Sequence, residues 1–256
     1  MRILIANDDG IYSPGLLALG QVAKEFAEVR IFAPDVEQSS MGHAITHSRP
    51  LSIRPTPIGD FEAYRVNGTP ADCVALGVHL WEKVDLVLSG INLGPNLGNA
   101  MWHSGTLAAA KQAALLGLRG IALSTPTMGT EPDFAKLRPY VHRVLELLIG
   151  EPSLCLVNVN FPPEPSGLVW AHQSVRHYDG RVVPGEDPMG RRHFWLTVEP
   201  IEEVEEASDR WAVERGLVSI TPLRLDLTDG AQLARLRKEH PLQGDAGVPD
   251  APVAAS

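Results

Sequence analysis

The chain alternates short apolar segments with longer helical segments through its first 160 residues. Residues Ile3 to Ile5 are too few and too uniformly apolar for an amphipathic helix, and they predict a buried parallel strand. Further strands are expected at Val29 to Ala33, Val84 to Ser89, Gly120 to Ser124 and Cys155 to Asn160, and helices at Leu16 to Phe26, Ala71 to Trp81, Thr106 to Leu116 and Phe134 to Ile149. This alternation predicts an α/β fold, a doubly wound and mostly parallel sheet covered by helices.

Two regions interrupt the alternation. Between His43 and Val66, short extended pieces at Leu51 to Arg54 and Phe61 to Val66 predict a hairpin beside the main sheet. Residues Val169 to Glu206 are rich in aromatic, charged, Gly and Pro residues and predict β-hairpins, with turns at 178–181 and 187–190. We expect this second region to be a protruding arm that serves as an oligomer contact.

The C-terminal part returns to a strand pattern at Leu217 to Leu225, and residues 243–256 have the small, polar composition of a disordered tail. We therefore divide the chain into an α/β catalytic core (1–165), a β-rich arm with a returning strand that together form an oligomerisation segment (166–229), and a C-terminal helix with a flexible tail (230–256).

Composition excludes several classes of function. The chain has 22 basic and 31 acidic residues, and a net charge of -9 gives no footprint for nucleic acid polymers or anionic membranes. An anionic substrate would need a local device such as a metal ion or a helix N-terminus. No apolar run approaches the roughly 20 residues that cross a bilayer. With two cysteines and no signal-peptide pattern, we expect a cytoplasmic protein without disulfides.

Adjacent carboxylates, Asp8 and Asp9, follow the first strand. Open parallel sheets bind ligands at the carboxyl ends of their strands, so the pair is expected at that edge. A divalent cation with hard oxygen ligands relieves the repulsion between two such carboxylates. The alternative is that Asn7 to Gly10 only turns the chain.

Other polar segments fall at the same edge. Ser39 and Ser40 follow the second strand and add hydroxyl oxygens. Gly90 to Gly98 follows a buried strand, and its glycines could let backbone N–H groups and the side chains of Asn92 and Asn96 face one small ion. Residues His103 to Thr106 precede a helix, where Ser104 or Thr106 would cap the first turn and help to form an anion cradle. Lys111, one turn into that helix, is expected to face solvent.

Together these clusters offer Asp, Ser and Asn oxygens for Mg²⁺, Mn²⁺ or Ca²⁺ and a cradle for phosphate, a combination that indicates phosphoester chemistry. A response-regulator receiver also has an acidic pair after its first strand, but the position of its acceptor Asp is Gly90 here. A metal-dependent sugar or amide hydrolase is less favoured, because such enzymes usually have histidines at metal-ligand spacing and no such pair accompanies Asp8 and Asp9. A nucleotide- or phosphate-binding regulator without turnover remains the alternative, because the same groups bind monoesters without hydrolysing them.

The motifs resemble those of one family from residue 1 to about 225. They are Asn7 to Gly10 with Pro14 and Gly15, Ala33 and Pro34 leading to Gln38 and Ser39, Val66 to Asp72, Ser89 to Gly98, Ser104 to Thr106, and Val218 to Leu223. The chain resembles the SurE family of survival proteins. The resemblance implies a Rossmann-like α/β sandwich with a C-terminal arm exchanged in a homodimer or homotetramer.

The resemblance also implies a metal-dependent phosphatase, a 5′-nucleotidase that acts on nucleoside 5′- and 3′-monophosphates and sometimes on short polyphosphate. One divalent ion per subunit would be held by Asp8, Asp9, Ser39 and Asn92, with Asp8 and Asp9 catalytic, and the phosphate by Asn96, Ser104, Gly105 and Thr106. The family usually has Tyr where this chain has His103, after Trp102, and we expect this difference to affect base preference more than catalysis.

Overall fold

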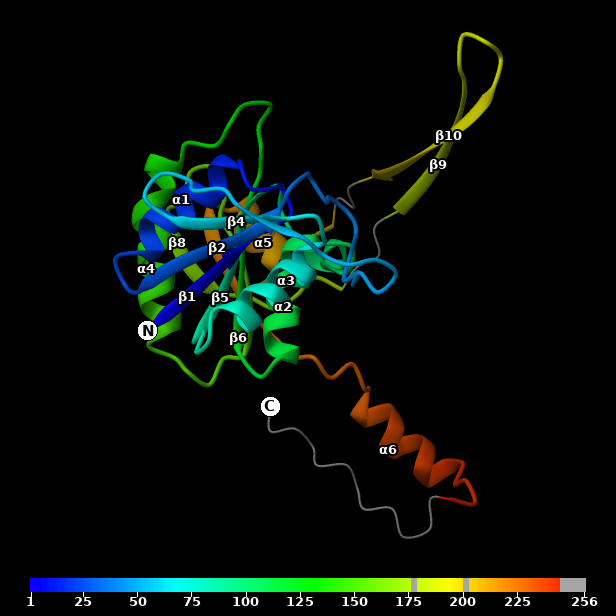
Figure 1. Cartoon of the computed structure of the whole chain (residues 1–256). Helices are drawn as coiled ribbons and strands as arrows, with labels where there is room; N and C mark the ends of the chain where they lie inside the picture. Colours follow the sequence, from blue (N-terminus) through cyan, green and yellow to red (C-terminus); the bar gives the residue numbers. More distant parts are fainter. Residues whose placement is uncertain (176–178, 200–202, 245–256) are drawn as a thin grey trace. The chain divides into compact units, whose positions relative to one another are not determined.

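A nine-stranded sheet forms the centre of residues 1–223 (Figure 1). The computed structural model describes residues 1–175, 179–199 and 203–244. The strand order is β3-β4-β2-β1-β5-β6-β7-β11-β8. The strands are β1 (Arg2–Ala6), β2 (Glu28–Pro34), β3 (Ile53–Pro55), β4 (Glu62–Val66), β5 (Leu86–Leu93), β6 (Arg119–Thr125), β7 (Leu156–Asn160), β8 (Gly167–Trp170) and β11 (Leu217–Leu223).

Most neighbouring strands run parallel, as the sequence predicted. The pairs from β4 through β2, β1, β5 and β6 to β7 are all parallel, whereas β3 pairs antiparallel with β4 and β11 antiparallel with β7. A parallel neighbour requires a crossover connection, and helices supply most of these. They are α1 (Pro14–Ala23), α2 (Pro70–Leu80), α3 (Gly105–Leu115) and α4 (Phe134–Ile149), with α5 (Asp209–Glu214) preceding β11.

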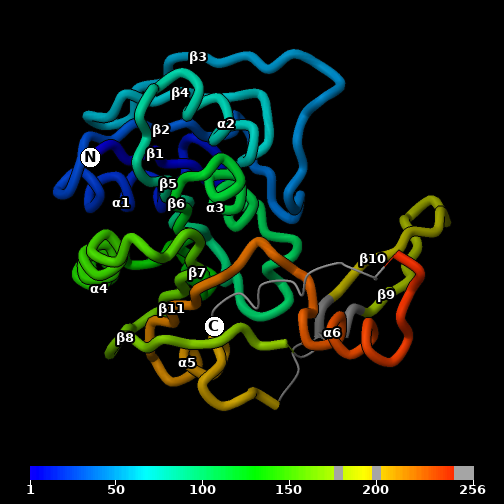
Figure 2. The backbone as a smooth tube through the Cα atoms, turned by 90° about the horizontal axis from the view of Figure 1, so that it is seen from below, coloured from blue at the N-terminus to red at the C-terminus, as the bar shows by residue number. Residues whose placement is uncertain are grey.

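Alternate residues of the central strands enter two separate cores. Ile3 and Ile5 of β1 pack with residues of α1 and α4, while Leu4 packs with residues of α2 and α3. All three side chains are buried, and full burial of such a side chain stabilises the fold by roughly 1.5–3 kcal/mol. Figure 2 shows the chain from below, with α1 and α4 separated from α2 and α3. The predicted sheet sandwiched by helices is confirmed.

Three local predictions need correction. The hairpin predicted beside the main sheet is β3–β4, but β4 pairs with β2, so the hairpin forms the edge of the main sheet itself. β5 continues to Leu93, so Asn92 belongs to a strand rather than to the loop after it. α1 ends at Ala23, before Phe26.

The predicted arm contains one antiparallel hairpin, β9 (Asp179–Glu186) with β10 (Arg192–Glu199). Its turn falls at 187–190 as predicted, where the N–H of Gly190 donates to the carbonyl of Asp187. The turn predicted at 178–181 is wrong for Asp179 to Arg181, which lie in β9, and Tyr178 lies outside the described residues. Residues Val169 and Trp170, also assigned to the arm, belong to β8 of the main sheet.

Contacts divide the chain into Met1–Leu223 and Arg224–Ser256. The second unit contains α6 (Gly230–Glu239), which Asp229 caps by accepting a hydrogen bond from the N–H of Gln232 at 2.9 Å. Of the predicted disordered tail, residues 245–256 lie outside the described residues. The division at residues 165 and 229 stays a prediction.

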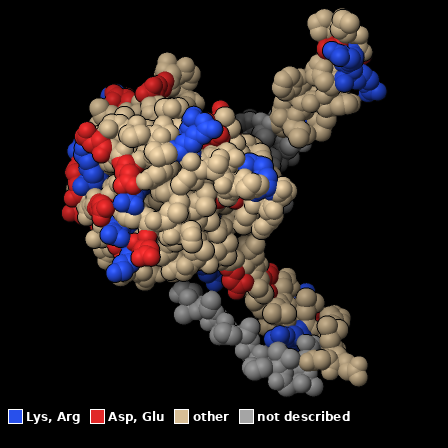
Figure 3. All heavy atoms as spheres, in the orientation of Figure 1, with Lys and Arg blue, Asp and Glu red and all other residues tan. Residues whose placement is uncertain are grey.

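Surface and cysteine properties complete the description. Basic and acidic side chains are interspersed over the face of the core drawn in Figure 3. Within the described residues, no helix has the length and apolar character to cross a membrane. Cys73 and Cys155 are both free.

Candidate active site

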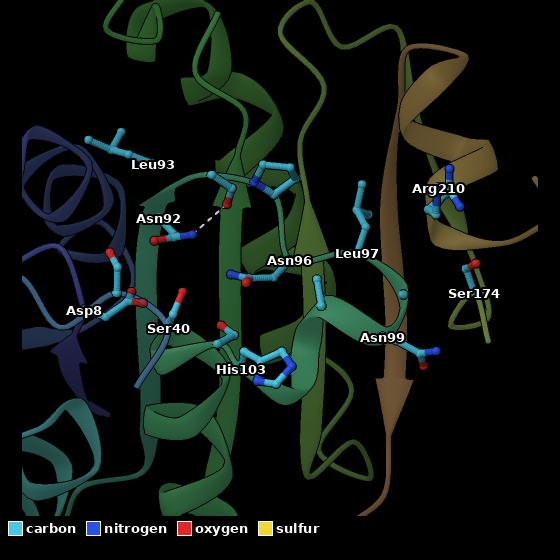
Figure 4. A pocket seen from close by; sticks show the side chains of 16 residues that line it. Asp8, Ser40, Asn92, Leu93, Asn96, Leu97, Asn99, His103, Ser174 and Arg210 are labelled. Carbon is cyan, nitrogen blue, oxygen red and sulfur yellow. Dashed lines mark hydrogen bonds between the residues drawn. The ribbon is translucent and has the colours of Figure 1, made fainter. Parts of the chain in front are cut away.

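A cavity of about 500 Å³ opens at the carboxyl ends of β1 and β5 (Figure 4). Of the residues predicted for the site, Asp8, Ser39, Asn92, Asn96 and Ser104 line this cavity. Asp9, Gly105 and Thr106 do not line it, but each contacts a residue that does. The structure therefore brings together segments that are up to 98 residues apart in the sequence.

Asp8 is the one carboxylate among the described residues that line the cavity, and 4 % of its surface is exposed. Its Oδ1 accepts a 2.6 Å hydrogen bond from the hydroxyl of Thr106, in the first turn of α3. Burial raises the pKa of Asp8 above 3.8 even though hydrogen bonds, chiefly that of Thr106, act to lower it. The carboxylate is therefore held in a fixed position but is poorly solvated.

Asp9 lies beside it and is partly buried. Burial and then the charge of Asp8 raise the pKa of Asp9 to about 6, against the 3.2 Å hydrogen bond that it accepts from the N–H of Leu93. The charge of Glu37 raises the pKa of both aspartates further. Among the described residues, neither aspartate forms an ion pair with Lys, Arg or His.

This arrangement fits a divalent cation. Two poorly solvated carboxylates that repel each other favour a bound positive charge, and oxygen donors suit Mg²⁺, Mn²⁺ or Ca²⁺. The amide nitrogen of Asn92 donates to the carbonyl of Gly94 at 2.6 Å, and Figure 4 shows the oxygen end turned toward Asp8. No group of three or more His, Cys, Asp or Glu within the described ranges could hold a metal, so the set depends on Asn and Ser oxygens.

Ser39 is less well prepared for this role than the other predicted ligands. It is exposed, and its hydroxyl donates to Oε1 of Glu37 at 2.5 Å. Glu37 was not singled out from the sequence, because a single acidic residue in a loop carries no distinctive pattern. Its proximity to both aspartates adds negative charge to the same edge of the sheet.

The glycine-rich loop differs from the expectation. Four of its backbone N–H groups donate to protein acceptors rather than toward a ligand. Leu93 donates to Asp9, Gly94 to the carbonyl of Thr125, Asn96 to Oδ1 of Asn160 and Gly98 to Oδ2 of Asp209. The loop is thus fastened to its surroundings, and the prediction that these N–H groups face a ligand is wrong.

Asn96 is the centre of a buried polar network behind the cavity. Its amide nitrogen donates to Ser124 at 2.8 Å and, more weakly, to Thr106 at 3.4 Å. Its backbone carbonyl accepts hydrogen bonds from the side-chain amides of Asn158 and Asn160. Asn96 would have to release the longer contact to donate to a phosphate oxygen.

The start of α3 packs directly against Asp8. Ser104 caps the helix by accepting a 3.0 Å hydrogen bond from the N–H of Leu107. A Cβ on Gly105 would lie 2.8 Å from the Cβ of Asp8, closer than real contacts, so only glycine fits there. Lys111 is half-buried with its ammonium 5.5 Å from the ring centre of Trp102, so the expectation that it faces solvent is wrong.

Four lining residues, Asn99, Ala100, Ser174 and Arg210, were not singled out from the sequence. They line the cavity together with Ser40, Leu97, Gly98 and His103, which belong to segments noted in the sequence. Ser174 and Arg210 lie far along the chain from the other motifs and have no pattern of their own, so only the fold reveals them. Figure 4 shows them at the end of the cavity away from Asp8.

Comparison with known proteins identifies the family. The model of the family described as survival protein SurE matches residues 3–180. The chain belongs to the SurE family.

Similarity to individual SurE proteins extends over almost the whole chain. A 5′-nucleotidase SurE 1 of Thermus thermophilus is 48% identical over 235 residues, which cover 89% of this chain and 93% of that protein. A 5′-nucleotidase SurE of Deinococcus radiodurans is 45% identical over 249 residues, covering 94% and 93%. The crystal structure of a SurE protein from Aquifex aeolicus matches with a TM-score of 0.80 at 37% identity, covering 93% of this chain and 99% of that one.

Proposed function

We propose that this SurE protein is a metal-dependent phosphatase, a 5′-nucleotidase that hydrolyses nucleoside 5′- and 3′-monophosphates to nucleoside and phosphate, with short polyphosphate as a further substrate. The observation that carries the proposal is the pair Asp8 and Asp9 at the carboxyl end of β1, next to the N-terminus of α3 and at the edge of a 500 Å³ cavity. The names of its relatives support a nucleotide substrate.

One divalent ion per subunit, Mg²⁺ or Mn²⁺ with Ca²⁺ as a further candidate, would be held by Asp8, Asp9, Ser39 and Asn92. When bound, such an ion polarises a phosphoryl oxygen and lowers the pKa of a bound water. The donor set described above supports this choice, because it contains only oxygen atoms.

The protein's own groups would then carry out the remaining tasks. Asp8 or Asp9 orients the attacking water and accepts its proton. Ser104, Gly105, Thr106 and Asn96 bind the phosphate, and the hydroxyls and N–H groups at the start of α3 stabilise the charge that develops on its oxygens. In the present arrangement Thr106 donates to Asp8, so its first contribution is to orient that carboxylate.

A cytoplasmic location and assembly into a homodimer or homotetramer belong to the same proposal. Support for assembly comes from β9 and β10, on which Val182, Phe194, Trp195 and Leu196 expose between 56% and 85% of their surface. Exposed apolar side chains that cluster on one hairpin are typical of a protein–protein interface.

The test is phosphate release from a panel of nucleoside 5′- and 3′-monophosphates. EDTA-stripped protein is compared with protein to which Mg²⁺, Mn²⁺ or Ca²⁺ has been returned. We expect release only after metal is restored. Tight nucleotide binding without release, with any of the metals, would instead identify a non-hydrolytic regulator and overturn the proposal.

A further inference from the structure

Gly98, in the wall of the cavity away from Asp8, is held at both of its backbone polar groups. Its N–H donates to Oδ2 of Asp209 at 2.8 Å, and its carbonyl accepts a 3.2 Å hydrogen bond from the side chain of Gln173. Its φ of +52° lies in the left-handed region, and an added Cβ would lie 3.0 Å from the carbonyl oxygen of Ser174. The backbone at this point is therefore fixed by residues from distant parts of the chain.

Asp209 is the centre of this clamp. It is completely buried, and its carboxylate also accepts hydrogen bonds from the N–H of Ser174 at 3.1 Å and of Arg210 at 2.8 Å. Its own N–H donates to the carbonyl of His172 at 2.8 Å. The carboxylate of Asp209 thus holds three backbone N–H groups at fixed relative positions. Breaking any of these hydrogen bonds would leave a buried polar group without a partner, which costs free energy.

The residues that the clamp joins all belong to one end of the cavity. Gly98 begins a 3₁₀ turn (Gly98–Trp102) that leads directly to Ser104, and Leu97 to Ala100 line the cavity. Ser174 and Arg210, the two other residues that Asp209 fastens, line the same end. Figure 4 shows Asn99, Ser174 and Arg210 across the cavity from Asp8.

We infer that Asp209, assisted by Gln173, is a positioning residue that sets the affinity of the cavity for the nucleoside part of its substrate. The inference rests on the proposed function. With the phosphate at Asp8 and the start of α3, the remainder of a nucleoside monophosphate extends toward the wall that Asp209 fixes. Contacts with this wall are the same in the ground state and the transition state, so they govern KM rather than kcat.

Two variants test the inference. Asp209→Asn keeps one carbonyl oxygen for Ser174 and Arg210 but turns an N–H₂ group toward the N–H of Gly98, so two donors face each other. Gln173→Ala removes the other bond to Gly98 from a half-exposed side chain, where a folding defect is not expected. Ser208→Ala is the matched control, because it removes only the 3.2 Å hydrogen bond to the N–H of Trp211 that caps α5.

For both test variants we expect KM for AMP to rise about three- to tenfold, as the loss of one hydrogen bond implies, with kcat within twofold of the parent. Inhibition by inorganic phosphate, which reaches only the phosphate end, should stay unchanged. Amide hydrogen exchange in residues 97–103 should become faster in Asp209→Asn. The control should show none of these changes.

Calorimetric binding of AMP, measured in parallel, separates this inference from the proposed function. If the parent protein releases no phosphate, the proposed function fails, while the ratio of AMP dissociation constants still tests the clamp. An unchanged KM and dissociation constant in both variants would overturn the inference. So would an equal loss of AMP and phosphate affinity, or a fall in kcat alone.

Discussion

The hydroxyl of Thr106 donates a 2.6 Å hydrogen bond to Oδ1 of Asp8 and so joins the first turn of α3 to the end of β1. The partners are 98 positions apart in the sequence and both are buried. Because Asp8 is desolvated, the direction in which its oxygens point depends on this donor. The helix start thus orients the carboxylate that we assign to the metal and the attacking water.

Thr106→Val removes this donor while keeping the shape of the side chain. We expect phosphatase activity to fall about 10- to 100-fold, the usual cost of losing the group that orients a metal ligand, with a parallel loss of metal affinity. Steady-state kinetics and metal titration measure the two effects. Thr106→Ser retains the hydroxyl and should recover most of the activity. If Val and Ser variants behaved alike, the hydroxyl would have no orienting role.

Gly105→Ala places a methyl group 2.8 Å from the Cβ of Asp8, so the helix start or the carboxylate must move. We expect a loss of about 1–3 kcal/mol in the free energy of unfolding, as for other overpacked sites, and a large loss of activity. Chemical denaturation and phosphate release measure these. Gly230→Ala is the matched control, since Gly230 also begins a helix but has open space around its Cβ position. Equal effects of the two substitutions would contradict the contact with Asp8.

The sequence alone was sufficient to predict the alternation of strands and helices in the first 160 residues and the edge of the sheet at which Asp8, Asp9, Ser39 and Asn92 lie. The reason is that apolar strands are short and distinct, and that the carboxyl ends of parallel strands share one edge. The tertiary partners of individual groups were not predictable in this way. The N–H groups of the glycine-rich loop donate to acceptors that lie up to 111 residues away in the sequence, which no local pattern encodes.

The placement of the strands at the edges of the sheet was likewise not predictable from local sequence. β3–β4 and β8 join the main sheet because of pairings with β2 and β11 that are set by the whole fold.

The positioning role of Asp209 could not be recognised in the sequence either, because acidic residues are common near the start of helices. Its burial and its bond to Gly98 become visible only when the two segments are brought together.

Ser104→Gly tests the phosphate cradle separately from helix capping. Gly replaces a Ser cap at a cost of only a few tenths of a kcal/mol, so the fold should be nearly unchanged. We expect weaker substrate binding or slower turnover, by roughly tenfold, with metal affinity retained. Kinetics on nucleoside monophosphates and metal titration measure these effects. Unchanged kinetics would remove Ser104 from the phosphate site.

Asp8→Asn tests the metal site most directly. The substitution keeps one acceptor for Thr106 but removes the charge, so we expect at least about a hundredfold loss of phosphatase activity with the fold intact. Phosphate release and thermal unfolding of the stripped protein measure the two properties. Asp35→Asn, at an exposed position just after β2, is the control and should keep its activity. Near wild-type turnover of Asp8→Asn would exclude Asp8 as a ligand.

Asp72 gives a pH dependence of stability that is independent of the cavity. Burial alone would raise its pKa, but hydrogen bonds from Thr46 and Thr69 outweigh burial and lower the pKa below 3.8. A group whose pKa is lower in the folded state stabilises the fold above its unfolded pKa, about 3.9, and this contribution is lost as the pH falls through the folded value.

Asp72→Asn should therefore reduce the free energy of unfolding at pH 7 by about 1–3 kcal/mol, because the single oxygen of Asn cannot accept the hydrogen bonds at both Oδ1 and Oδ2. The difference between the two proteins should shrink when the pH is lowered toward 3, where the carboxylate of the parent begins to bind a proton. Urea denaturation of stripped protein across this range measures it. Asp133→Asn, which alters an exposed cap of α4, should give a smaller difference at pH 7. A gap between parent and Asp72→Asn that stayed constant with pH would mean that packing, and not the charge of Asp72, stabilises the start of α2.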